Sequence, residues 1–152
     1  MTAALIRPVN ADDFAGWRPL WDGYNAFYGR HGEQALPEAI TLATWERLLD
    51  PAEPMHALVA QQAAQLVGLT HFIFHRSTTR LEPSCYLSDL YTLPGQRGQG
   101  VGRALVEAVA DHARARGVQR VYWQTHESNH GARRLYEQLA QHQGFIVYAM
   151  TL

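Results

Sequence analysis

The sequence predicts a single domain, residues 1–152, of the α/β class with a mixed sheet flanked by helices. Its length is that of one compact domain, about 100–150 residues. Hydrophobic residues make up 47% of the chain and charged residues 18%, a composition that supports a core and argues against disorder. Strand-like and helix-like patterns follow in the order strand, helices, several strands, helix, strand, helix, strand, which indicates the fold class.

The first third of the chain predicts one strand and two helices. Residues 5–9 have the short pattern of a strand, and Asn10 is typical of a helix start. Residues 12–28 predict a helix, with Pro19 as the point where it would break. The side chains of its apolar stripe lie mostly three or four residues apart: Phe14, Trp17, Leu20, Trp21, Tyr24, Phe27 and Tyr28. Residues 41–49 predict a second, short helix.

The middle of the chain predicts three strands and a helix. Residues 56–61, 65–75 and 84–92 have strand patterns, and a three-residue turn separates the first two. The glycine-rich run 95–102 follows, and it opens an amphipathic helix with an apolar face. Gly117 lies where the C-terminal stop of that helix is expected.

The end of the chain predicts strand, helix and strand. Residues 118–126 form the first of these, and Ser128 or Asn129 caps a helix that runs to about His142. Gly144 ends that helix, and residues 145–151 predict a last strand. Because this strand is short, we expect it to pair across two chains, which would make the protein a homodimer.

Charge and composition exclude several classes of partner. The formal net charge is −1, so the chain lacks the strongly basic balance of a nucleic-acid-binding domain. No signal peptide is visible at the start, and the apolar runs are far shorter than the ~18 residues of a membrane helix. The single cysteine, Cys85, permits no intrachain disulfide. We expect a cytoplasmic protein that binds neither membranes nor nucleic acids.

A glycine-rich loop carries the strongest functional signal. Glycines let the backbone turn tightly beside a ligand, and successive N–H groups at the start of a helix bind a pyrophosphate. The loop reads Gly-x-Gly-x-Gly and not the dinucleotide pattern Gly-x-Gly-x-x-Gly. A P-loop is also absent, because it needs a lysine and the chain contains none. The loop residues, with Arg103 adding positive charge, are Arg97, Gly98, Gln99, Gly100, Val101 and Gly102.

Three motifs in order resemble the GNAT superfamily of N-acetyltransferases. Arg97-x-x-Gly100-x-Gly102 is similar to its acetyl-CoA signature, Gln/Arg-x-x-Gly-x-Gly/Ala. Asn129-x-x-Ala132-x-x-Leu135-Tyr136-Glu137, with Gly144-Phe145 after it, resembles the next segment of the family, and Leu90-Tyr91-Thr92-Leu93-Pro94 resembles the strand before the loop. Four additional residues before Gly144 are a departure that leaves the position of the last strand open. The resemblance implies a mostly antiparallel twisted sheet, splayed at the acetyl-CoA site.

The same resemblance implies how the donor is held. The strand containing Leu90, Tyr91 and Thr92 would pair with the pantetheine arm, and a backbone N–H there would polarise the thioester carbonyl. The loop from Arg97 to Arg103 would hold the pyrophosphate. Asn129 would bind the pantetheine region. Acetyl-CoA is therefore the expected donor, and the family needs no metal.

The catalytic residues implied by the resemblance are Tyr136 and Asp89. Tyr136 would donate a proton to the departing sulfur, with a core aromatic as the alternative. Asp89 would accept the amine proton or hold the cationic substrate, because an ammonium of pKa ~10.4 must lose a proton before attack. His126 and Glu127 are rivals for the base. A structural role for Asp89, capping a strand bulge, is an equal alternative.

The resemblance implies that acceptor selection falls to the first helices. Most aromatics there are expected to be core, with Tyr24 and Tyr28 as the exceptions that line a slot for an alkyl amine. Asp22 or Glu33 would attract its charge. The substrate-binding set is Tyr24, Tyr28, Asp89 and Glu127. The lead acceptor is a polyamine-like small molecule; protein lysines or N-termini are an alternative, and an acyl-CoA-binding regulatory module without turnover is another.

Two further features predict no separate chemistry. His71 and His75 are expected on a surface strand face, since no other metal ligand accompanies them. Cys85 is expected to be a buried thiol rather than a nucleophile.

Overall fold

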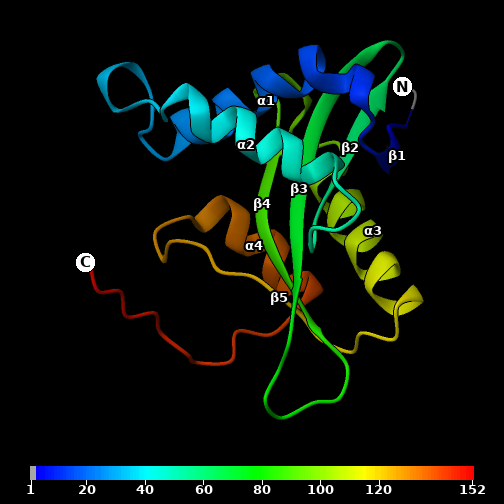
Figure 1. Cartoon of the computed structure of the whole chain (residues 1–152), viewed down its shortest axis with the longest axis vertical. Helices are drawn as coiled ribbons and strands as arrows, with labels where there is room; N and C mark the ends of the chain where they lie inside the picture. Colours follow the sequence, from blue (N-terminus) through cyan, green and yellow to red (C-terminus); the bar gives the residue numbers. More distant parts are fainter. Residues whose placement is uncertain (1–2) are drawn as a thin grey trace.

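A twisted five-stranded sheet runs through the centre of the computed structural model, which describes residues 3–152 (Figure 1). The strands lie in chain order, and each of the first four is antiparallel to its neighbour. The last strand pairs with the fourth in the parallel direction, so the sheet is mixed, as predicted. The strands are β1 (Leu5–Pro8), β2 (Met55–Gln62), β3 (Gln65–His75), β4 (Ser84–Thr92) and β5 (Val121–Tyr122).

Helices cover both faces of this sheet because its strands are apolar on both sides. On β2, Ala57 and Val59 face one cluster and Leu58 and Ala60 face the other, since successive strand side chains point in opposite directions. The first cluster packs under α1 (Phe14–Phe27) and α2 (Glu38–Leu49). The second packs under α3 (Val101–Ala115). Figure 1 shows these helices on the two sides of the strands.

Helix α1 is continuous through Pro19, so the break expected there is wrong. Asn10 begins this part of the chain with a capping box, in which its side chain and that of Asp13 satisfy each other's backbone N–H groups. Trp17, fully buried, and Leu20 fix the helix on the sheet from either side of the proline. Tertiary packing therefore offsets the one backbone hydrogen bond that proline removes.

A bulge in β4 decides which way its side chains point. His71 on β3 pairs with Asp89, but the next residue, Phe72, pairs with Leu87. Ser88 is therefore the extra residue of the bulge, which bends the strand and resets the alternation of its side chains. The sequence suggested that Asp89 serves a bulge in this strand. The bulged residue is its neighbour Ser88, whereas Asp89 pairs with His71 across the ladder.

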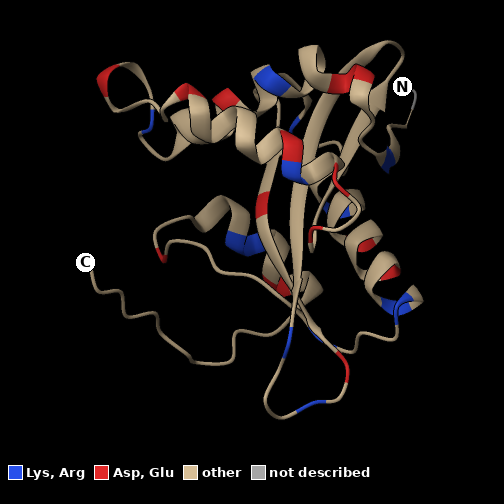
Figure 2. Cartoon of the chain, viewed as in Figure 1, with Lys and Arg blue, Asp and Glu red and all other residues tan. Residues whose placement is uncertain are grey.

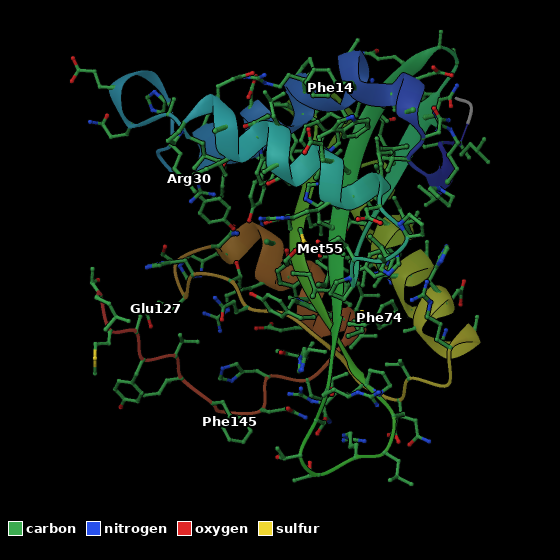
Figure 3. All side chains as sticks on the ribbon, viewed as in Figure 1. Phe14, Arg30, Met55, Phe74, Glu127 and Phe145 are labelled. Carbon is green, nitrogen blue, oxygen red and sulfur yellow. The ribbon has the colours of Figure 1, made fainter. Side chains whose placement is uncertain are left out.

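The C-terminal part of the chain differs from the prediction. The strand expected at 118–126 contains only Val121 and Tyr122, and helix α4 (His130–Leu139) ends before His142. Residues 145–151 form no strand. This segment has no regular secondary structure, and its aromatic side chains Phe145 and Tyr148 are 84% and 87% exposed. Figure 3 places the labelled Phe145 on this segment, away from the sheet.

Charged residues are dispersed over the fold. In Figure 2 acidic and basic segments alternate along the helices and loops instead of gathering on one element. Among residues 3–152, no helix combines the length and the apolar character that crossing a membrane would require. The dispersed charges of both signs agree with the near-zero net charge of the sequence.

Candidate active site

A cleft opens where β4 and β5 separate. The two strands pair only at Cys85 with Val121 and at Tyr86 with Tyr122. Beyond that point the edge of β4 faces a cavity of about 380 Å³ instead of a strand. Its lining comes from the end of α1, from β4, from the segment after β5, from α4 and from the C-terminal segment: Tyr24, Tyr28, Arg30, Tyr86, Leu87, Ser88, Asp89, Leu90, Trp123, Gln124, Thr125, His126, Tyr136 and Val147.

Asp89 lies on one wall of the cleft within a network of hydrogen bonds. His71 is buried on β3, and its Nδ1 lies 2.9 Å from Oδ2 of Asp89. The Nε1–H of Trp17 donates to Nε2 of the same ring at 3.1 Å. Because an indole N–H can only donate, Nε2 of His71 accepts and Nδ1 carries the proton. The imidazole is therefore a fixed donor to the carboxylate.

The hydrogen bonds outweigh the burial of Asp89. Burial raises the pKa of this carboxyl, but donation from His71, Tyr24 and Ser88 lowers it further, so that its pKa lies below the usual range. The Ser88 hydroxyl lies 3.3 Å from Oδ2 of Asp89 and 3.2 Å from the carbonyl of His71, and it can donate to either. The carboxylate is thus charged at neutral pH.

Helix α1 supplies the opposite side of this wall. Gly23 brings the helix onto β4, because a Cβ there would lie 2.5 Å from the hydroxyl of Tyr91. The side chain of the following residue, Tyr24, hydrogen-bonds with Asp89. Burial and the neighbouring carboxylate raise the pKa of Tyr24 far above its ordinary value, so its hydroxyl keeps its proton.

Tyr136 enters the cleft from α4. Its ring packs edge-on against Trp123, with 5.5 Å between ring centroids. Burial raises the pKa of Tyr136 to about 12. The phenol is therefore protonated at neutral pH and faces the same cavity as Asp89. A positioned proton donor and a carboxylate on two walls of one cleft can serve proton-transfer chemistry.

The glycine-rich loop has the backbone conformation that glycine permits. Gly98 and Gly100 have φ angles of 77° and 82°, in the left-handed region. No atom of the described residues 3–152 would lie within 4 Å of a Cβ added at either, so they leave the space beside the loop open. Gly100 caps α3, whose first N–H groups have no partner within the helix. The loop therefore presents free donors at the positive end of the helix.

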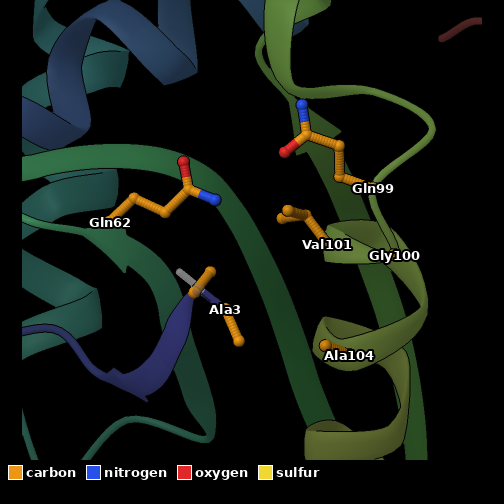
Figure 4. A pocket seen from close by; sticks show the side chains of 7 residues that line it. Ala3, Gln62, Gln99, Gly100, Val101 and Ala104 are labelled. Carbon is orange, nitrogen blue, oxygen red and sulfur yellow. The ribbon is translucent and has the colours of Figure 1, made fainter. Parts of the chain in front are cut away.

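Packing fixes the start of α3 against the sheet. A Cβ at Gly68 on β3 would lie 3.0 Å from a methyl of Val101 and 3.2 Å from one of Leu105. The glycine thus permits the close approach that holds the loop beside β4. A second cavity, of about 310 Å³, borders the loop at Gln99 and Gly100 (Figure 4).

The cofactor residues predicted from the sequence fall into two groups. Leu90 lines the cleft, whereas Tyr91 on the next position packs toward α1. Arg97 is turned back over the ring of Tyr91 and donates to the carbonyl of Thr92. Arg103 pairs with side chains of α3 and α4, namely Glu107 and Gln138. A Cβ added at Gly102 would lie 3.6 Å from a methyl of Leu135, and Val101 is buried. Both residues therefore belong to the packed start of α3.

The substrate residues predicted from the sequence also divide. Tyr24 and Tyr28 both line the cleft, as does Asp89. Glu127 lies outside it, on the exposed loop before α4, while its neighbour His126 lines it. Figure 3 shows the labelled Glu127 on that loop. Asn129 is tied to Thr125 by a side-chain hydrogen bond of 3.1 Å and is not a lining residue.

Two charges expected at the slot lie elsewhere. Asp22 pairs with Arg18 on the outer side of α1 at 3.0 Å, and Glu33 is exposed on the following loop. Phe27, expected in the core, is 56% exposed. Cys85 is fully buried, as predicted, and burial raises the pKa of its thiol to about 11.

Sequence reasoning missed several residues of the site, among them His71, Arg30 and Trp123. His71 is 2% exposed, so the surface position predicted for it is wrong; its position opposite Asp89 depends on the register of two strands. Arg30 and Trp123 line the cleft although no motif contains them. Spacing along the chain gave no signal for these contacts. Within residues 3–152 no cluster of three or more histidine, cysteine or carboxylate side chains has the geometry of a metal site.

Comparison with known proteins agrees with this geometry. Residues 17–140 match the family model described as Acetyltransferase (GNAT) family. The D-amino-acid N-acetyltransferase HPA3 of Saccharomyces cerevisiae is 28% identical over 146 residues, which are 95% of this chain and 88% of the relative.

Solved structures of the same fold cover nearly the whole chain. A ribosomal-protein-alanine N-acetyltransferase from Brucella melitensis has a TM-score of 0.78 at 24% identity, covering 99% of this chain and 100% of its own. AAC(6')-Iy, solved in complex with the bisubstrate analogue CoA-S-monomethyl-acetylneamine, has a TM-score of 0.83 at 18% identity, and the match covers 99% of each chain. On the family match to most of its length, the chain belongs to the acetyltransferase (GNAT) family and is an N-acetyltransferase of the GNAT type.

Proposed function

We propose that the protein transfers the acetyl group of acetyl-CoA directly to the primary amine of a small molecule bound in the cleft between β4 and β5. The observation that carries this proposal is the pairing of a charged carboxylate, Asp89, with a protonated phenol, Tyr136, across one cavity. The family match supports the acetyl transfer itself. The size and aromatic walls of the cavity support a small acceptor.

The residues around the cleft fit acetyl-CoA. From Leu87 onward, no strand of the described residues pairs with the edge of β4 that faces β5, so its backbone is available to the pantetheine arm there. The open loop at Gly98 and Gly100 and the free N–H groups of α3 fit a pyrophosphate. When bound, the thioester supplies an acetyl group already activated toward an amine. Arg97 and Asn129, both engaged within the protein, would have to exchange those contacts to bind the donor.

The loop provides a direct test of donor binding. We expect Gly100→Val to raise the KM for acetyl-CoA at least tenfold, because a side chain would crowd the N–H groups and disfavour the positive φ by about 1–2 kcal/mol. Gly117→Val is the control, since Gly117 has a similar φ of 73° at the other end of α3. Calorimetry with CoA would measure both affinities. Equal weakening in the two variants would contradict phosphate binding at the loop.

Within the acceptor site, Asp89 is the proposed anchor of the ammonium group. A carboxylate with a lowered pKa is a poor proton store but a strong partner for a cation. His126 is less suited to act as the base, because its Nδ1 accepts from the backbone N–H of Ser128 at 3.1 Å. In the neutral ring Nε2 then carries the proton and can only donate. The amine proton would leave through Asp89 or through water beside it.

At the opposite wall, Tyr136 is the proposed general acid. Its phenol, with a pKa of about 12, holds a proton that the departing thiolate of CoA can take. The edge-on contact with Trp123 fixes the ring. No residue between these two walls needs to form a covalent intermediate, and the high pKa of Cys85 argues against a thiolate nucleophile.

Release of free thiol from acetyl-CoA tests the proposal. We expect thiol release that depends on both the enzyme and a small primary amine. Binding of acetyl-CoA at micromolar concentration without thiol release for any amine or lysine peptide would favour a regulatory binding module. Release only with peptides would favour the protein-directed alternative, and no binding at millimolar concentration would overturn the proposal.

A homodimer also remains a proposal. The exposed apolar side chains of residues 145–152 support it, because a chain seldom leaves such a segment in water without a partner. The strand predicted there would then form between chains and not within one.

A further inference from the structure

The acceptor end of the cleft contains two opposite charges. Among the described residues that line it, Asp89 is the one carboxylate and Arg30 the one guanidinium. The remaining titratable side chains of the lining are phenols and one imidazole: Tyr24, Tyr28, Tyr86, Tyr136 and His126. A cavity with one fixed charge of each sign matches a ligand that carries the two opposite charges itself.

Arg30 is held in place by buried groups. Its Nε donates to Oδ1 of Asn25 at 2.7 Å, and Asn25 is buried and donates in turn to the carbonyl of Trp21 at 2.9 Å. The guanidinium lies over the rings of Tyr24 and Tyr28, at 5.8 and 5.4 Å from their centroids. No acidic side chain of the described residues pairs with it, so its terminal N–H groups are free to bind an anion in the fork geometry that suits a carboxylate.

Tyr24 sets the separation of the two charges. Its ring lies under the guanidinium of Arg30, and its hydroxyl faces the carboxylate of Asp89. Both charges act on the pKa of this phenol, Asp89 raising it and Arg30 lowering it. The charges are therefore about one tyrosine side chain apart, with a contact at each end, which is a span that a small zwitterion can bridge.

Resting on the acetyltransferase function proposed above, we propose that the acceptor is an amino acid or a close analogue. Its ammonium group binds Asp89, where the amine can face the donor, and its carboxylate binds Arg30. A polyamine fits this site less well, because its second ammonium group would approach the guanidinium. Arg30 thus selects among amines, while Asp89 and Tyr136 serve the transfer.

The test compares acceptors that differ only in the carboxylate. Alanine, leucine and phenylalanine, each in both enantiomers, are assayed by thiol release beside their carboxamides and their decarboxylated amines; putrescine is the polyamine. We expect at least one amino acid to have a kcat/KM tenfold or more above its amide and its amine. In Arg30→Met this ratio should fall at least tenfold, and Arg30→Lys should retain part of it.

A matched control separates charge from packing. Arg120 also stacks on a tyrosine, 4.1 Å from the ring centroid of Tyr122, but it lies outside the cleft. Arg120→Met should therefore keep the wild-type ratio. The inference is overturned if amides and amines are acetylated as well as the acids, or if Arg30→Met slows all acceptors in equal proportion. Absence of thiol release with every amine would instead overturn the acetyltransferase proposal, so the two failures are distinguishable.

Discussion

Replacing Tyr136 by phenylalanine should lower kcat about 100-fold or more while leaving the affinity for acetyl-CoA nearly unchanged. The substitution removes one hydroxyl and keeps the ring that packs on Trp123. A positioned general acid contributes typically 10²–10⁴-fold to a rate, so the loss should be in turnover and not in binding. Because burial raises the pKa of this phenol to about 12, it is a proton donor over the whole neutral range.

The measurement is steady-state thiol release combined with calorimetry of CoA binding. Tyr148→Phe is the control, since Tyr148 is exposed and outside the cleft. If Tyr136→Phe turned over as fast as the parent, the role of general acid would be wrong. A loss of CoA affinity equal to the loss of rate would assign the residue to the donor site alone.

Replacing Asp89 by asparagine should lower kcat/KM for the amine by about 10–100-fold. Asparagine keeps an oxygen that can accept from Nδ1 of His71, so the network on β3 has a replacement partner. What is lost is the negative charge, and hydrogen bonds to charged groups are worth about 1.5–3 kcal/mol. The effect should appear in KM for the amine more than in the affinity for acetyl-CoA.

Glu127→Gln is the matched control for this charge. Glu127 is an exposed carboxylate on the loop before α4, outside the lining of the cleft. It should cost little activity. If Glu127→Gln lowered activity more than Asp89→Asn, the carboxylate that binds the amine would have to be Glu127 on that loop and not Asp89.

The Asp89→Asn variant should also change how the stability of the fold depends on pH. The pKa of Asp89 is lower in the folded protein than its unfolded value of about 3.9. Its charge therefore stabilises the fold fully above about pH 4, and this contribution is lost as pH falls through the lower, folded pKa. Asp89→Asn should flatten the acid limb of the unfolding curve. Identical acid limbs for parent and variant would contradict the lowered pKa.

Much of the glycine-rich loop and of the central sheet could be predicted from the sequence. The run from Arg97 to Gly102 requires positive φ angles at specific glycines and an adjoining helix, and both requirements are local. The strands β2 to β4 also follow from local alternation, and their bounds agree with those expected to within a residue. Tyr136 was found through its motif on α4, which a helical period places on the face toward the cleft.

The ends of the sheet were less predictable because pairing is not local. Residues 118–126 and 145–151 both have apolar patterns, yet the first contributes two paired residues and the second none. A pattern states which residues prefer an apolar environment but not whether a free strand edge lies within reach. At the splay between β4 and β5 the edge of β4 beyond Tyr86 faces the cleft, and neither apolar segment extends the sheet there.

The sequence alone determined the family, the order of elements as far as α4 and the glycine-rich loop that opens α3, because each depends on neighbours a few residues apart. Only the tertiary structure decided which charged side chains line the cleft. His71 meets Trp17 across 54 positions, and the bulge at Ser88 turns Asp89 into the cleft beside Tyr24. Such contacts come from strand register and from the packing of α1 on the sheet, which no spacing along the chain encodes.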